Sequence, residues 1–100
     1  MNPTEELIKQ RDDEKMRLSA AVDAFAEKMK ARLFQKVDEG YLGWDDTGWD
    51  IVASMCHETG QLSSRAFTPE QKMRKSVDLA DFAMFYHHRY EQYQLQKGKE

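Results

Sequence analysis

The chain has 100 residues, with 15 Lys or Arg, 18 Asp or Glu and a net charge of −3. A chain of this length supports one hydrophobic core, so we expect a single domain over residues 1–100. The lone cysteine, Cys56, excludes an internal disulfide framework and a zinc site built on cysteine pairs. No apolar run approaches the ~18 residues of a membrane span, and the acidic N-terminus lacks a signal-peptide pattern. We therefore expect a cytoplasmic protein with no membrane partner.

The charge distribution and the apolar content indicate which classes of partner the chain can have. Residues 1–50 hold eight basic and twelve acidic residues, and residues 51–100 hold seven and six. Because nucleic-acid binders usually present a basic face, and the one basic cluster here spans a single helical turn (Lys72, Arg74 and Lys75), nucleic acid is disfavoured. Only 18 residues are Leu, Ile, Val or Phe. Such a small apolar content favours a domain that gains core by self-association.

The first segment is expected to be a long helix. Pro3 and the acids after it suit a helix start, and no Gly or Pro follows before Gly40, which supplies the C-cap. Apolar residues then recur at helical spacing: Leu18, Val22, Phe25, Met29 and Leu33. Residues 9–15 are almost wholly polar. This part indicates a projecting helical arm over about residues 1–17, or else a separate helix that begins at Ser19.

Two further helices follow a loop over residues 40–50. Asp46 or Thr47 is expected to cap a short helix that ends near Leu62. One face of this helix carries Trp49, Val52, Cys56 and Thr59. The third helix is expected to run from Pro69 to about Leu95 and to fray over residues 96–100. Its start has the strongest capping signal in the chain, Thr68-Pro69-Glu70-Gln71.

These elements predict an all-α fold of two long helices and one shorter helix. No segment alternates with period two, so strands are not expected. Tyr86, Tyr90 and Tyr93 form a stripe on the third helix, which favours a helix-packing or subunit seam over a ligand site. Together with the stripe on the first helix, this gives each long helix an apolar face. We therefore expect a homo-oligomer.

Two aspartates in an apolar stretch are the first candidate site. Asp78 and Asp81 are three residues apart, so on a helix they share one face about a turn from each other. Like charges at this spacing repel, and a divalent cation such as Mg²⁺ would relieve the repulsion while leaving room for substrate phosphates. The alternative is that one aspartate faces solvent and the other bonds a neighbouring helix.

Glu58 is the second candidate. It lies two residues beyond Cys56, on a shoulder of the second helix that can face another helix. There its carboxylate can join Asp78 and Asp81 as a third ligand, and Gln61 lies one turn further on as a weaker, uncharged ligand. The alternative is a solvated Glu near a helix C-terminus.

These segments resemble the MazG-like all-α nucleoside triphosphate pyrophosphohydrolases, in which E-E-x-x-E and E-x-x-D motifs on two helices hold Mg²⁺. Glu58 falls on the second acid of the first motif, with His57 and Gln61 in place of the other two acids. Asp78 and Asp81 match the second motif, with Asp in place of Glu. The phrases Gly43-Trp44-Asp45-Asp46 and Val77-Asp78-Leu79-Ala80-Asp81-Phe82-Ala83-Met84 are similar to those of small phage-encoded members. The likeness covers roughly residues 29–46 and 51–88.

The resemblance implies a hydrolase that releases a nucleoside monophosphate and pyrophosphate. Glu58, Asp78 and Asp81 would hold Mg²⁺ or Mn²⁺, with Gln61 as a further ligand, in a dimer or tetramer. Arg74 or Lys75 could hold the phosphates, and Arg74 shares a helical face with the two aspartates. Trp44 could stack on the base, or it could simply plug the helical core.

A second hypothesis belongs to another class of function. With two motif acids replaced, the chain could keep the helical fold and act as a phage protein that binds and modulates a host protein. The acidic first half and the polar residues 9–15 would then be its working surface. A hydrolase should release pyrophosphate and gain thermal stability from Mg²⁺, whereas a binding protein should do neither.

Overall fold

The computed structural model describes residues 2–46 and 49–99 as three helices. They are α1 (Pro3–Asp38), α2 (Ile51–Ser63) and α3 (Pro69–Lys97). No strand occurs in the described residues, which confirms the all-α prediction of two long helices and one shorter helix.

The helix ends follow the local sequence. Both long helices begin with a capping box and a proline in the first turn: Asn2 and Glu5 cap α1, and Thr68 and Gln71 cap α3. At the end of α1, Gly40 adopts a φ of +101°, its N–H donates to the carbonyl of Val37, and the next N–H reaches Lys36. Only glycine enters this region of backbone space without a Cβ penalty, so Gly40 stops α1 directly after its C-cap, which is Glu39 and not Gly40 as predicted.

Two details of the sequence-based boundaries are corrected. The helix α1 is continuous through Ser19, so no separate helix begins there. The cap of α2 is Asp50, whose Oδ1 accepts a hydrogen bond of 3.0 Å from the N–H of Ala53, and not Asp46. Asp46 instead closes a turn onto the carbonyl of Gly43. The alternative cap, Thr47, lies outside the described residues.

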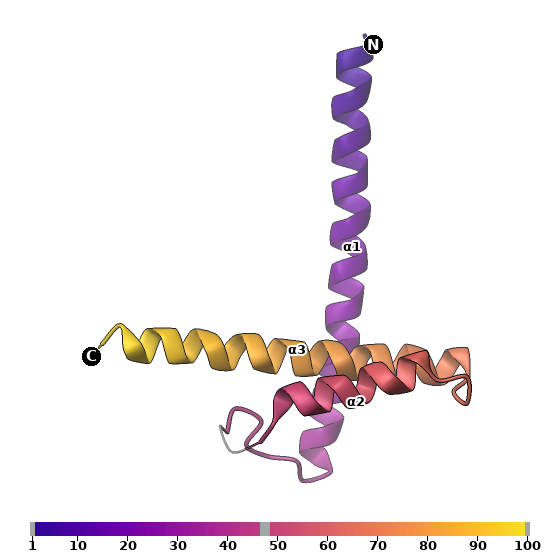
Figure 1. Cartoon of the computed structure of the whole chain (residues 1–100). Helices are drawn as coiled ribbons and strands as arrows, with labels where there is room; N and C mark the ends of the chain where they lie inside the picture. The colour runs from indigo at the N-terminus through magenta and orange to yellow at the C-terminus, as the bar shows by residue number, and fades with distance from the viewer. Residues whose placement is uncertain (1, 47–48, 100) are drawn as a thin grey trace.

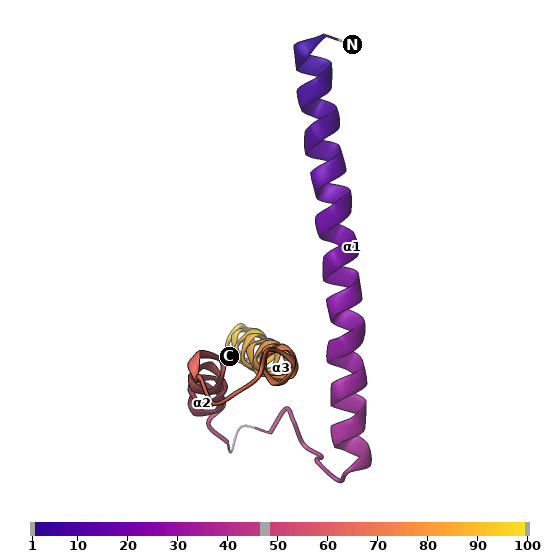
Figure 2. The same ribbon diagram turned by 90° about the vertical axis from the view of Figure 1, so that its right-hand side faces the viewer.

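The helix α3 is the centre of the arrangement. Helix α2 runs antiparallel alongside it, and α1 crosses on the other side at a steep angle (Figures 1 and 2). Contacts join α2 to α3 and α1 to α3. The N-terminal part of α1 projects away from the other helices, and so does the C-terminal part of α3 (Figure 1). A site that draws residues from all three helices therefore has to lie along the first half of α3.

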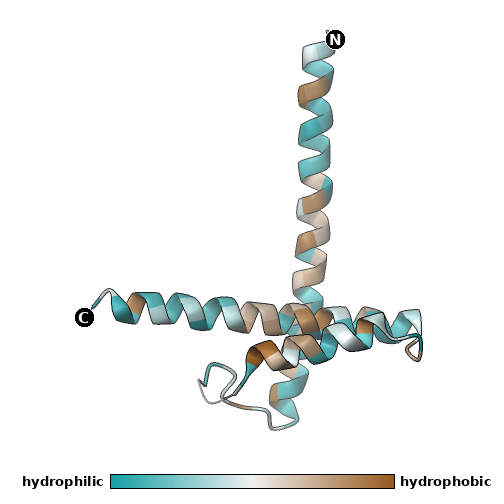
Figure 3. Cartoon of the chain, in the orientation of Figure 1, coloured by the Kyte–Doolittle hydropathy of each residue, from teal (hydrophilic) through white to brown (hydrophobic). Residues whose placement is uncertain are grey.

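The hydrophobic core is small. Ile51, Val77 and Phe85 are the buried apolar side chains among the described residues. Hydropathy follows the same layout, with hydrophobic residues gathered where α2 and α3 run together and separate bands along the projecting α1 (Figure 3). The radius of gyration is 18.4 Å, against about 13 Å for a compact chain of this length. Much apolar surface on the long helices is therefore not covered within one chain.

The face that α2 turns to α3 differs from the stripe expected from the sequence. Ile51 and Glu58 are buried, whereas Val52, Cys56 and Thr59 are exposed. Those three residues lie along the outer side of α2, beside Tyr86 of α3. Among the described residues, no helix combines the length and hydrophobicity needed to cross a bilayer.

Candidate functional site

The three predicted acids lie on the two adjacent helices α2 and α3. Glu58 of α2 and Asp81 of α3 are buried, with 8% and 4% of their surfaces exposed, and the side chain of Asp78 is 15% exposed. Carboxylates are rarely buried to this extent, because losing water costs free energy that only a partner can offset. Glu58 is therefore not the solvated residue of the alternative reading.

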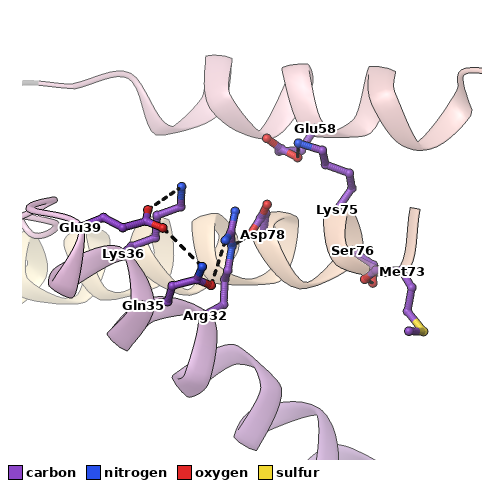
Figure 4. A network of polar contacts seen from close by, with 9 residues as sticks. All are labelled: Arg32, Gln35, Lys36, Glu39, Glu58, Met73, Lys75, Ser76 and Asp78. Atoms are coloured by element: carbon purple, nitrogen blue, oxygen red, sulfur yellow. Dashed lines mark hydrogen bonds and ion pairs between the residues drawn. The ribbon is translucent and has the colours of Figure 1, made fainter. Parts of the chain in front are cut away.

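Two of these acids are matched by basic side chains. Arg32 of α1 donates from Nε to Oδ1 of Asp78 over 2.9 Å, and this hydrogen bond raises the pKa of Arg32 (Figure 4). Nζ of Lys75 lies 3.8 Å from Oε2 of Glu58, and the two side chains point toward one another across α3 and α2 (Figure 4). One helix thus supplies the cation for an acid on another helix. The pairing neutralises Asp78 and Glu58 within the chain.

Asp81 forms no ion pair with any residue that the structure describes. Its Oδ1 is buried and has no hydrogen-bond partner among the described residues. Burial, together with the neighbouring charge of Asp78, raises the pKa of Asp81 to about 7, although the charge of Arg32 offsets part of the rise. A carboxyl group held in this way is half protonated near neutral pH, which is the behaviour of a group that lacks a cation.

Further buried oxygen atoms without hydrogen-bond partners lie on α2. Oε2 of Glu58 and Oε1 of Gln61 both belong to this group among the described residues. Gln61 Nε2 contacts Nε2 of His57 at 3.1 Å, which fixes the amide and leaves its oxygen free. Native proteins contain few such atoms, so each one calls for an explanation, such as a bound ion or water.

The donor set suits a hard divalent cation. Mg²⁺ takes carboxylate oxygens, and Glu58, Asp78 and Asp81 supply them. Within residues 2–46 and 49–99, however, no group of three or more His, Cys, Asp or Glu side chains is gathered in a way that could hold a metal ion. A cation at these acids would therefore have to displace Arg32 and Lys75 and draw the carboxylates together.

The predicted phosphate-binding residues have different surroundings. Lys75 is the partner of Glu58, so its charge is partly used within the chain. Arg74 is exposed and lines a hollow between α1 and α3. Both residues lie on the half of α3 that carries Asp78.

Trp44 packs against α3 one turn from Asp81. Its ring stacks on Phe85 with centroids 5.2 Å apart and lies 4.8 Å from the ring of His88. Phe85 also meets Trp49 edge-on at 5.8 Å. These contacts hold the loop before α2 against α3. Trp44 thus takes part in packing, while 40% of its surface remains exposed.

Two arginines make contacts at the site that were not predicted from the sequence. Arg32 pairs with Asp78, and Arg89 donates to the backbone carbonyls of Trp49 and Asp46, which ties the loop to α3. A signal for Arg32 was present, because it lies three residues after Met29 and seven after Phe25, on the face of α1 that packs. A basic residue at the margin of an apolar stripe is placed to meet an acid on the facing helix. We see no comparable signal for Arg89.

Comparison with known proteins finds no match for this chain, whether among protein-family models, curated proteins or solved structures.

Proposed function

We propose that the chain is a Mg²⁺-dependent nucleoside triphosphate pyrophosphohydrolase of the MazG-like class. The observation that carries the proposal is the burial of Glu58 and Asp81 at the α2–α3 contact, each with a carboxylate oxygen that lacks a hydrogen bond among the described residues. Glu58, Asp78 and Asp81 would hold Mg²⁺ or Mn²⁺, with Gln61 as a neutral ligand. When bound, the ion would neutralise phosphate charge and lower the pKa of a coordinated water.

The chain's own residues would do the rest. Arg74 and Lys75 would bind the phosphates by charge, and Arg32 would exchange its bond with Asp78 for a phosphate oxygen. Trp44 is stacked on Phe85 one turn from Asp81, and a base could lie against the 40% of its surface that remains exposed. The test is a panel of nucleoside triphosphates incubated with the protein, with and without Mg²⁺, and with pyrophosphate release measured. Release that is absent with every nucleotide would contradict the proposal.

A second function is favoured by the ion pairs. Because Arg32 and Lys75 already neutralise Asp78 and Glu58, the acids can serve the fold alone. The chain would then be a MazG-like protein that binds a partner, such as a host protein of a phage, through the exposed α1 arm. In that case Mg²⁺ should not change the stability of the protein, and the protein should not hydrolyse any nucleotide when Mg²⁺ is present.

Gln61→Glu separates these two functions. A fourth carboxylate, added to those of Glu58, Asp78 and Asp81, should tighten Mg²⁺ binding by about 1–3 kcal/mol, the scale of one charge-assisted contact offset by its desolvation. Without an ion, the new charge would repel Glu58 and lower the melting temperature. The two functions are distinguished by the melting temperatures of the variant and the wild type, each measured with and without Mg²⁺. A variant that is destabilised and not rescued by Mg²⁺ would favour the binding protein.

We also propose that the chain is a homo-oligomer, a dimer or a tetramer. Leu18 and Val22 on α1, and Tyr86, Tyr90 and Tyr93 on α3, are exposed in the single chain. Sedimentation at micromolar concentration should therefore report a dimer or larger. Val22→Glu should weaken the association, whereas Ala20→Glu, on the opposite side of α1, should not. A clean monomer would contradict this expectation.

A further inference from the structure

A hollow between α1 and the first half of α3 gathers basic side chains. Its volume is about 550 Å³, within the range of small-molecule sites. Lys28 and Arg32 line it from α1, and Arg74 and Lys75 line it from α3. The acidic residue in the lining is Asp78. Four positive charges thus face one negative charge, in a chain whose net charge is −3.

Two of these four cations are not neutralised by any residue in the described part of the chain. Arg32 pairs with Asp78, and Lys75 pairs with Glu58. The charged groups of Lys28 and Arg74 make no ion pair with any residue that the structure describes. Like charges around one hollow repel each other, and an anion that contacts several of them would relieve the repulsion.

The polar surroundings also suit an anion. Gln35 and Gln71 belong to the same lining, and the side-chain oxygen of Gln35 accepts a hydrogen bond of 3.1 Å from Nη1 of Arg32 (Figure 4). This bond holds the guanidinium in place between α1 and α3. Arginine side chains offer paired N–H groups that match phosphate oxygens, and lysine adds point charge.

We propose that this hollow binds a diphosphate or triphosphate group directly, without a metal ion. With Asp78 paired to Arg32 and Glu58 paired to Lys75, a formal charge of +2 remains around the hollow, which an anion with several negative charges can neutralise, whereas a single carboxylate or chloride would leave half of it uncompensated. The group could belong to a nucleotide or to free pyrophosphate, which share this chemistry. A bound phosphate chain would give Arg32 and Lys75 a second anionic partner and would lie beside Asp78.

The inference that this hollow is the binding site for the substrate's phosphates rests on the proposed hydrolase function. The binding of free pyrophosphate does not, so the two can fail separately. Pyrophosphate that binds to a protein unable to hydrolyse any nucleotide would support the anion site and contradict the hydrolase. Nucleotide hydrolysis without measurable pyrophosphate binding in the absence of metal would overturn the anion site alone.

The test is calorimetric titration of the full chain in a chelator with pyrophosphate, tripolyphosphate and a nucleoside triphosphate. Lys28→Gln combined with Arg74→Gln removes the two unpaired cations and should weaken the binding of all three about tenfold to a hundredfold. Lys9→Gln combined with Arg11→Gln removes the same two charge types from the projecting arm and should leave binding unchanged. Tighter binding of the nucleotide than of tripolyphosphate would identify the nucleotide as the source of the phosphates.

Two results would overturn the proposal. The first is equal affinity of the two double variants, since binding would then depend only on net charge. The second is an affinity for single-stranded RNA that exceeds the affinity for tripolyphosphate and is lost in the Lys28 and Arg74 double variant, because the hollow would then belong to a nucleic-acid surface.

Discussion

Asp81→Ala is expected to abolish pyrophosphate release, lowering the rate by about a thousandfold or more. The physical reason is the position of the carboxyl group. It is buried at the contact between α2 and α3, and among the described residues its Oδ1 has no hydrogen-bond partner that could substitute for a cation. The measurement is the steady-state rate of pyrophosphate release from the best nucleotide of the panel, at saturating Mg²⁺.

The control is Asp13→Ala, which removes the same side chain from the exposed arm of α1 and should keep the wild-type rate. Circular dichroism should show unchanged helix content for both variants, so that a lost rate cannot be assigned to unfolding. Normal turnover by the folded Asp81→Ala protein would show that the metal site has been assigned to the wrong residues.

Asp81→Asn is expected to change how stability depends on pH. The pKa of Asp81 is about 7 in the folded chain, against 3.8 for an unperturbed aspartate, which represents the unfolded chain. The folded chain therefore binds this proton more tightly than the unfolded chain does. The wild type therefore loses stability as the pH rises between these two values, by about 2–3 kcal/mol from pH 5 to pH 8. The asparagine variant carries no charge at this position and should lack this loss.

The measurement is urea unfolding of both proteins at pH 5 and pH 8, in a chelator so that no metal binds. All other ionisable groups are shared, so the difference in unfolding free energy between the two proteins isolates Asp81. As the pH rises, the unfolding free energy of the asparagine variant should increase relative to that of the wild type. A difference that does not change with pH would mean that Asp81 is ionised in the folded chain at both values.

The helices could be predicted from the sequence because their signals are local. The capping box at Thr68 and Gln71 and the glycine at the end of α1 each act within one turn of backbone. The cap of α2 was misplaced because Asp46 and Asp50 are equally good caps by residue type. Long-range contacts decide between them, since Arg89 of α3 binds the carbonyl of Asp46 and holds it in the loop.

The site could be predicted only in part. Helical spacing placed Asp78 and Asp81 on one face, and the shoulder position of Glu58 correctly brought it to α3. The basic partners of these acids were not foreseen, because Arg32 comes from α1, and 46 residues separate it from Asp78. Periodicity fixes which face of a helix a residue occupies, but it does not fix which helix packs against that face. The ion pairs are therefore a finding of the structure.

We propose that Glu58, Asp78 and Asp81 hold a divalent cation, and the most direct test is the binding of Mn²⁺ itself. Electron paramagnetic resonance measures free aqueous Mn²⁺, so binding to the protein lowers its signal. We expect a saturable loss of the signal with the wild-type protein and a much smaller loss with Asp81→Ala at the same concentration. A signal that neither protein lowers, or that both lower equally, would show that these three acids do not hold the cation.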